Sequence, residues 1–202
     1  MLCDTLATKA NTSDFTETLM KCRSTDDAAE LPIEVQRLNI PLERDIFLRT
    51  LIRELAGTLE EIVGYEEAAG YISLVGQNMG EWINSLYKRE MGVSSLSRCQ
   101  VADVLVDLKR RIQGCFSIVQ QDETKIVFTN SNCPFEDKVV DRPSMCMMTS
   151  NVFGVIAADN LGYAKVVLEE TIAQGNKGCR VVVYLQQTEE ASAATGREYY
   201  GS

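Results

Sequence analysis

Cysteine is the side chain best suited to chemistry in this sequence, because histidine is absent altogether. The seven cysteines stand at positions 3, 22, 99, 115, 133, 146 and 179. The lack of an imidazole excludes Ser-His and Cys-His catalysis, histidine phosphotransfer and histidine-bound metals. An odd number of cysteines, in a chain that shows no secretory signal, argues against a disulfide framework. The cysteine side chains are therefore expected to be either thiolate ligands or buried thiols.

Three cysteines fall at expected junctions between elements: Cys133 in a loop, Cys146 in the first turn of a helix and Cys179 at the start of a strand. The free N–H groups and the positive dipole end of a helix lower the pKa of a thiol there, and the thiolate is the form that binds metal. An all-thiolate set suits zinc or an iron–sulfur cluster. The sequence therefore predicts that Cys133, Cys146 and Cys179 bind a cofactor. The alternative is that they are small buried hydrophobes.

Cys115 is predicted to be the fourth metal ligand. Residues 115–120 and 125–129 are expected to form a hairpin, which brings the start of its first strand beside the end of its second. Cys115, Cys133, Cys146 and Cys179 should then gather at one end of the sheet. The other three cysteines, Cys3, Cys22 and Cys99, are expected to lie elsewhere.

Charge and composition limit the partners of the chain. A net charge of −9 and a pI near 4.7 argue against direct binding to nucleic acid, which rests on clustered Lys and Arg. No stretch approaches the roughly 20 consecutive apolar residues of a membrane span. Residues 1–14 also lack the basic and apolar parts of a signal peptide. We therefore expect a soluble protein of the cytoplasm.

The first half is predicted to be helical after a linker. Residues 1–40 show no sustained periodicity and are expected to form a linker or a loosely docked arm. After Pro41 an apolar seam recurs at spacings of three and four and predicts an amphipathic helix that stops at Gly64. The seam consists of Leu48, Ile52, Leu55, Leu59 and Ile62. It fits helix pairing across a homodimer as well as packing within the domain.

Two further helices are expected in this half. The first covers residues 68–90, where Gly70, Gly76 and Gly80 would let another backbone approach closely. The second follows a capping box at Ser97 and closes near Gly114.

The second half is predicted to combine short strands with one long helix. A loop at 132–135 follows the hairpin, and Pro143 announces a helix that starts near Ser144. The apolar segment 145–173 is expected to continue that helix, bent or split at Gly154 and Gly162, before a buried strand at 179–185. After residue 188 the composition suggests a frayed tail.

The expected fold class is α+β, with N-terminal helices packed on a small antiparallel sheet and a long cysteine-bearing helix. Residues 41–188 would form a single regulatory domain. Its helical part is expected over 41–113 and its cysteine-bearing part over 114–188, with a tail at 189–202.

Three cysteine-containing runs suggest a family: Asn132-Cys133-Pro134-Phe135, Pro143-Ser144-Met145-Cys146 and Gly175-Asn176-Lys177-Gly178-Cys179-Arg180-Val181. Together they resemble the sensor and output domains grouped around the methanogen output domain and the four-vinyl-reductase domain. The resemblance covers about residues 114–186. The spacing from Cys133 to Cys146 is also similar to that of the first two cluster ligands in iron–sulfur assembly repressors.

The resemblance implies a signal-transduction module, usually dimeric, attached to DNA-binding, kinase or receiver domains and controlled by a small-molecule or metal-based input. The relatives carry one more cysteine shortly before the last. This sequence has Glu169, Glu170 and Thr171 there.

These observations predict a sensor or output domain rather than an enzyme. Its thiolate-bound iron–sulfur or zinc cofactor, or an adjacent pocket, would bias the arrangement of paired helices in response to a small-molecule or redox signal. The domain would so control a regulatory partner or fused domain. One alternative is an enzyme with Cys146 as nucleophile and Glu136 or Asp137 as base. The other is a structural dimerisation module held together by zinc.

Overall fold

The computed structural model describes residue 35 and residues 37–201. Residues 43–202 form one compact unit, and the elements below all belong to it. The predicted linker at 1–40 falls mostly on residues 1–34 and 36, which lie outside the described residues. Within the described part of the chain, no helix is long and apolar enough to cross a membrane.

The three predicted helices of the first half are confirmed as α3 (Arg44–Val63), α4 (Tyr65–Met91) and α5 (Arg98–Arg111). Gly64 separates α3 from α4 with a φ of 83°, a backbone conformation that glycine adopts without a steric penalty. The capping box at Ser97 is present: its hydroxyl accepts from the N–H of Gln100, whose side chain accepts from the N–H of Ser97.

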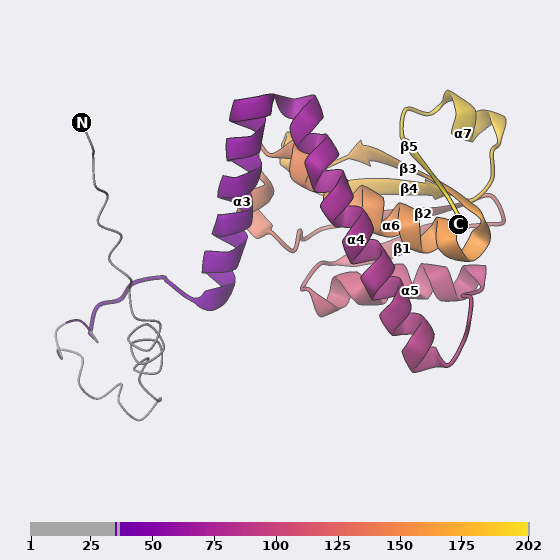
Figure 1. Ribbon diagram of the computed structural model, residues 1–202, viewed down its shortest axis with the longest axis horizontal. Helices are drawn as coiled ribbons and strands as arrows, with labels where there is room; N and C mark the ends of the chain where they lie inside the picture. The colour runs from indigo at the N-terminus through magenta and orange to yellow at the C-terminus, as the bar shows by residue number, and fades with distance from the viewer. Residues whose placement is uncertain (1–34, 36, 202) are drawn as a thin grey trace, which may run out of the picture. The chain divides into compact units, whose positions relative to one another are not determined.

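A five-stranded antiparallel sheet follows, in the order β1-β2-β4-β3-β5 (Figure 1). The predicted hairpin is confirmed as β1 (Phe116–Gln121) and β2 (Lys125–Asn130), and the last predicted strand as β4 (Cys179–Tyr184). The carboxylate of Asp122 fixes the hairpin turn by accepting from the N–H groups of Thr124 and Lys125. The expected α+β fold class is therefore confirmed.

The long helix predicted over 145–173 is too long. Helix α6 spans Cys146–Leu161, after a 3-10 turn, η3 (Pro143–Met145), and it ends where Gly162 adopts a φ of 87°. The chain then continues as β3 (Tyr163–Glu170), and the short turns η2 (Glu136–Val139) and η4 (Ile172–Gln174) flank this region. Strand β3 pairs with β4 and β5 and is buried over four consecutive residues, 164–167. Its sequence therefore lacks the alternation that marks a half-exposed strand.

The prediction of a frayed tail after residue 188 is also wrong. Thr188 caps a short helix, α7 (Glu189–Ala193), by accepting from the N–H of Ala191. The chain then adds strand β5 (Arg197–Tyr200) to the edge of the sheet beside β3. This segment gains its structure from pairing with β3 and not from a local pattern.

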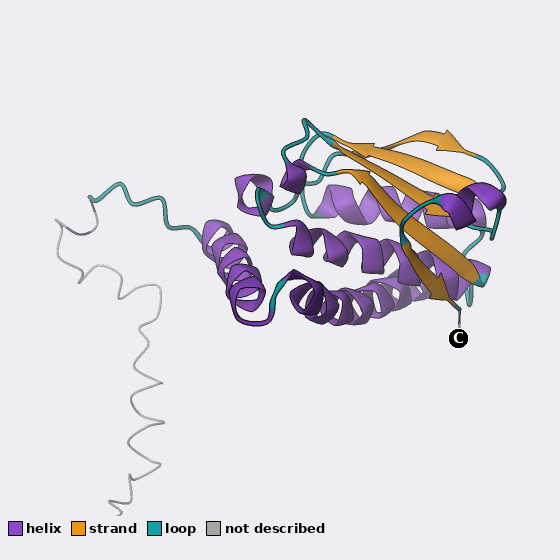
Figure 2. Cartoon of the chain, turned by 90° about the horizontal axis from the view of Figure 1, so that it is seen from above, coloured by secondary structure: helices purple, strands orange, loops and turns teal. Residues whose placement is uncertain are grey.

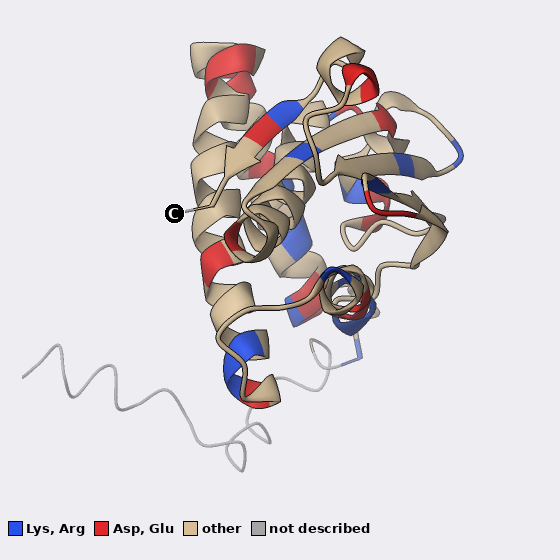
Figure 3. Ribbon diagram, turned by 90° about the vertical axis from the view of Figure 1, so that its right-hand side faces the viewer, with Lys and Arg blue, Asp and Glu red and all other residues tan. Residues whose placement is uncertain are grey.

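The two faces of the sheet are covered differently. Helices α4, α5 and α6 gather on one face, as Figure 2 shows, with α6 in contact with the sheet, α4 and α5. The main core lies there and includes Phe128, Phe153 and Ile156. On the opposite face Val127, Val167 and Val182 pack against Ala191 of α7. Lys and Arg residues are interspersed with Asp and Glu over the helices and strands (Figure 3).

Glycines set the close approach of α4 to α6. A Cβ atom at Gly76 would lie 2.8 Å from the Cβ of Asn151 and 3.2 Å from the Cα of Met148, both in α6. A Cβ atom at Gly80 would lie 3.0 Å from the Cβ of Val155. Gly70 is different, since nothing lies within 4 Å of its added Cβ. The predicted close approach is therefore confirmed at two of the three glycines, and α4 is not interrupted at any of them.

Candidate functional site

Three predicted site residues meet at one small cavity at an end of the sheet. Cys133 follows β2, Cys146 begins α6 and Cys179 begins β4. All three are partly buried and line a cavity of about 70 Å³. Further lining residues come from α5, β1, β2, α6 and the segment after β3, and they include Lys109, Phe116, Asn130, Thr149 and Thr171.

The strand register and local hydrogen bonds position Cys179. Asn130 of β2 stands opposite Cys179 in the antiparallel pair. The Cys179 sulfur accepts from the N–H of Ile172 at 3.5 Å and lies 3.8 Å from the side-chain nitrogen of Asn130. The first residue of β4 is thus held at the cavity by its neighbours in the sheet and in η4.

The other cysteines stand apart from the cavity. The N–H of Cys115 donates to the carbonyl of Asn132 at 3.2 Å, which places its backbone at the same end of the sheet. The Cys115 side chain is exposed, however, and does not line the cavity. Cys99 is exposed on α5, and Cys3 and Cys22 lie outside the described residues.

Burial keeps two of the cavity thiols protonated. It raises the pKa of Cys146 to about 12, and the charges of Cys133 and Cys179 add to that effect. Burial also raises the pKa of Cys133, partly opposed by a hydrogen bond from the backbone of Phe135. The expectation that the helix start lowers the pKa of Cys146 is wrong, because desolvation of the thiolate outweighs the helix dipole.

The three thiols do not form a metal centre in this conformation. Within residues 35 and 37–201, no three Cys, Asp or Glu side chains make a group that could hold a metal ion.

Lys109 is the cavity residue that the sequence did not single out. It is only 5% exposed, and its Nζ donates to the Thr149 hydroxyl at 2.8 Å. The same nitrogen lies 5.3 Å from the centre of the Phe116 ring and 5.4 Å from that of Phe153. No carboxylate of the described chain forms an ion pair with it. Burial lowers the pKa of Lys109 to about 8, partly opposed by Cys133, Cys146 and Cys179.

A weak signal for Lys109 was present in the sequence. Lys109 lies four residues after Leu105 and eight after Val101, two fully buried residues of α5. It therefore stands at the edge of the buried face of that helix. A charged residue in that position is usually assigned to solvent, and only the tertiary contacts show that Lys109 points inward.

The acidic residues considered as catalytic bases lie outside the cavity. Glu136 pairs with Arg49 at 2.5 Å, and Asp137 pairs with Lys138 at 2.9 Å. Neither carboxylate lines the cavity that holds Cys146. Among the described residues no carboxylate lines the cavity beside Cys146, and burial raises the pKa of this thiol.

Comparisons with known proteins identify a matching family and solved structures with a similar fold. The profile of the family described as methanogen output domain 1 matches residues 51–184, more than half of the chain. No curated protein sequence matches significantly.

Two solved structures share the fold. The phenol-responsive sensory domain of the transcription activator PoxR, solved with phenol, aligns with a TM-score of 0.57 and 18% identity, over 76% of this chain and 80% of that one. A trafficking protein particle complex subunit 3 from Naegleria fowleri, covalently bound to palmitic acid, aligns with a TM-score of 0.50 and 13% identity, over 70% of this chain and 96% of that one.

The buried ammonium of Lys109 gives a pH-dependent prediction. Below pH 8 the folded and unfolded states both hold the proton, so the full desolvation penalty of about 3 kcal/mol applies to the folded state. Between the folded pKa of about 8 and the ordinary value of 10.5, only the unfolded state keeps the proton, and stability rises with pH. Lys109→Met should therefore be more stable than the wild type at pH 7. This advantage should shrink by about 2 kcal/mol at pH 9.5.

Urea unfolding of both proteins at the two pH values measures this difference. Lys177→Met is the matched control, because Lys177 is exposed in the loop before β4, and its difference from the wild type should stay constant. A Lys109→Met variant that is equally destabilised at both pH values would contradict the burial of a charged Lys109.

Proposed function

Because the chain belongs to the methanogen output domain 1 family, we propose that it is a signal-transduction domain whose input is a small anionic effector bound beside Lys109. The resemblance noted over residues 114–186 is confirmed, and the matched region begins earlier, at residue 51. The proposal rests on one observation: a buried ammonium lines the cavity without a carboxylate partner.

The charge and size of the cavity define the effector. A buried cation without a counterion is costly, and an anion in contact with it removes much of that cost. The cavity of about 70 Å³ is smaller than the engineered cavity of about 150 Å³ that holds benzene. A carboxylate of a few non-hydrogen atoms therefore suits the site, with its oxygens toward Lys109 and its apolar part toward Phe116.

The two structural relatives support a ligand-controlled role for this fold. PoxR is described as phenol-responsive, and its sensory domain was solved with phenol. The trafficking subunit carries a covalently bound fatty acid. Both molecules are largely apolar, and both were found in proteins with this arrangement of helices and strands.

Helix α6 provides a route from the cavity to the surface of the helical layer. Its first turn carries Cys146 and Thr149 at the cavity. The next turns pack directly on Gly76 and Gly80 of α4. An effector that moves the start of α6 would therefore change the position of α4, since Gly76 and Gly80 leave no space between the two helices.

We further propose that α3 and α4 carry the output as an interface, in a homodimer or with a regulatory partner or fused domain. Four of the five residues of the predicted seam are exposed, namely Leu48, Ile52, Leu55 and Ile62. On α4, Leu74, Val75 and Trp82 are exposed as well. Exposed apolar side chains in this number on two consecutive helices are typical of an interaction surface.

A second candidate is the thiolate-bound cofactor predicted from the sequence, either zinc or an iron–sulfur cluster. One observation favours it, because Cys133, Cys146 and Cys179 line the same cavity. In this candidate the three thiols would hold the cofactor, and Cys115 would have to turn inward to become the fourth ligand.

An anionic effector site beside Lys109 predicts that acetate binds to the protein and that its neutral analogue acetamide does not. At pH 7, where Lys109 is charged, acetate should cause saturable changes in the NMR signals of Lys109, Thr149 and Cys146 in the full chain. Lys109→Met should abolish these changes, and Lys177→Met should retain them. Equal responses to acetate and acetamide, or binding that survives Lys109→Met, would exclude the charge-based site.

Metal analysis decides between the two candidates. If the cofactor candidate is correct, anaerobically purified protein should contain stoichiometric zinc or iron, and Cys146→Ser should lose it because a hydroxyl is a harder and less acidic ligand than a thiol. Cys99→Ser, at an exposed position on α5, should retain the metal. Sub-stoichiometric metal in the wild type, or equal metal in wild type and Cys146→Ser, would eliminate this candidate.

If the chain forms a homodimer, light scattering should give a mass of twice 22.5 kDa. Leu55→Glu should shift the protein toward the monomer, because it places a charge in the centre of the seam. Val119→Glu is the control, since Val119 is an exposed apolar residue on β1 away from α3 and α4. A monomeric wild type at high micromolar concentration would refute the dimer.

A further inference from the structure

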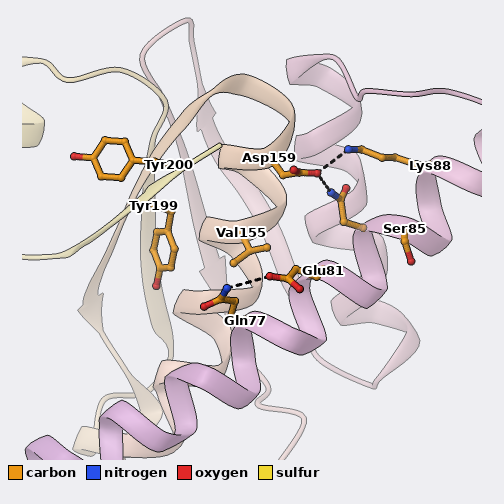
Figure 4. Close-up of a pocket in the computed structure, with 9 residues that line it drawn as sticks. Gln77, Glu81, Ser85, Lys88, Val155, Asp159, Tyr199 and Tyr200 are labelled. Carbon is orange, nitrogen blue, oxygen red and sulfur yellow. Dashed lines mark hydrogen bonds and ion pairs between the residues drawn. The ribbon is translucent and has the colours of Figure 1, made fainter. Parts of the chain in front are cut away.

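A second cavity lies between α4, α6 and β5, in a part of the molecule that the Lys109 site does not use. Its volume is about 500 Å³, within the usual range for small-molecule sites of roughly 300–1,000 Å³. Figure 4 shows Glu81 and Gln77 on one side of it, with Val155 and Tyr199 on the other. The cavity therefore combines a polar wall with an apolar one.

The charges of the polar wall do not cancel. Asp159 already has a cationic partner, because its Oδ2 accepts from Lys88 at 2.7 Å and also from Asn84 at 2.6 Å. Glu81 has no cationic partner among the described residues, and its carboxylate accepts only from the side-chain amide of Gln77, at 3.0 Å. This arrangement leaves one carboxylate without a counterion and the Gln77 carbonyl oxygen free as an acceptor.

The aromatic wall is held rigidly. The Tyr199 ring lies directly over Gly154, where an added Cβ atom would be 2.1 Å from the ring. The Tyr199 hydroxyl is in hydrogen-bond contact with that of Ser150 at 2.9 Å. Gly154 is therefore required for this placement of Tyr199, and the ring is fixed before any ligand arrives. A preformed aromatic surface beside an unpaired carboxylate suits a cation with an apolar body.

We propose that this cavity binds a small primary amine with an aromatic or branched apolar body. The ammonium group donates to the Glu81 carboxylate and to the Gln77 carbonyl oxygen, which together satisfy two of its three donors. The apolar body lies against Val155 and the Tyr199 ring. The walls of the cavity belong to α4, α6 and β5. An amine in this cavity would therefore contact both α4 and α6, the two helices that meet at Gly76 and Gly80.

A titration of the full chain with 2-phenylethylamine tests the proposal, with 2-phenylethanol as a ligand of the same body without the charge. At pH 7 the amine should give saturable changes in the NMR signals of Glu81, Val155 and Tyr199. The alcohol should bind about five-fold more weakly or not at all, in line with the contribution of an ion pair to an exposed carboxylate.

Two variants separate a specific site from general attraction to an acidic protein. Glu81→Gln removes the charge at an exposed position and should weaken amine binding about five-fold. Glu67→Gln, an exposed carboxylate of the same helix outside the cavity, should leave it unchanged. No saturable response to the amine, or equal affinity in wild type and Glu81→Gln, would overturn the proposal. Lys109→Met should bind the amine as the wild type does, so this result is independent of the effector proposed for the Lys109 cavity.

Discussion

The close contact of α6 with α4 is the constraint on which the rest of the structure depends. Gly76 and Gly80 let the two helices approach until backbone meets side chain, while the other side of α6 buries Phe153 and Ile156 against the sheet. Helix α6 is thus held from both sides. Its first turn carries Cys146 to the cavity of the three thiols, and its later turns support the Tyr199 ring through Gly154. Both candidate sites are therefore built on the same helix.

The burial of Lys109 costs folding stability and suits the binding of a ligand. A buried ammonium with one hydroxyl partner and two aromatic neighbours lowers the stability of the fold at neutral pH, and a methionine of similar length would fill the same space. Burial raises the pKa of Cys133 and of Cys146, so these two thiols are neutral at pH 7 and do not balance the charge of Lys109. An unbalanced charge in a small enclosed cavity is suited to binding an anion.

The parts of the fold that local chemistry determines could be predicted from the sequence. The Ser97 capping box, the Asp122 turn and the spacing of the α3 seam each depend on residues near in the chain, and the elements they imply are present. Strands β3 and β5 depend on pairing partners far along the chain, and both were missed. In the site, loop and strand boundaries indicated where Cys133, Cys146 and Cys179 would converge. The inward direction of Lys109 and the burial that raises the pKa of Cys146 arise only from tertiary packing.

The pKa of Lys109 itself is the most direct test of the central claim, that this residue is a buried cation available to an anionic effector. It can be measured by following the NMR signals of its side chain with pH, first without ligand and then with saturating acetate. The account predicts a pKa of about 8 in the free protein, and a higher value with acetate because a nearby anion favours the charged form. An ordinary value near 10.5 in the free protein, or a value that acetate leaves unchanged, would contradict it.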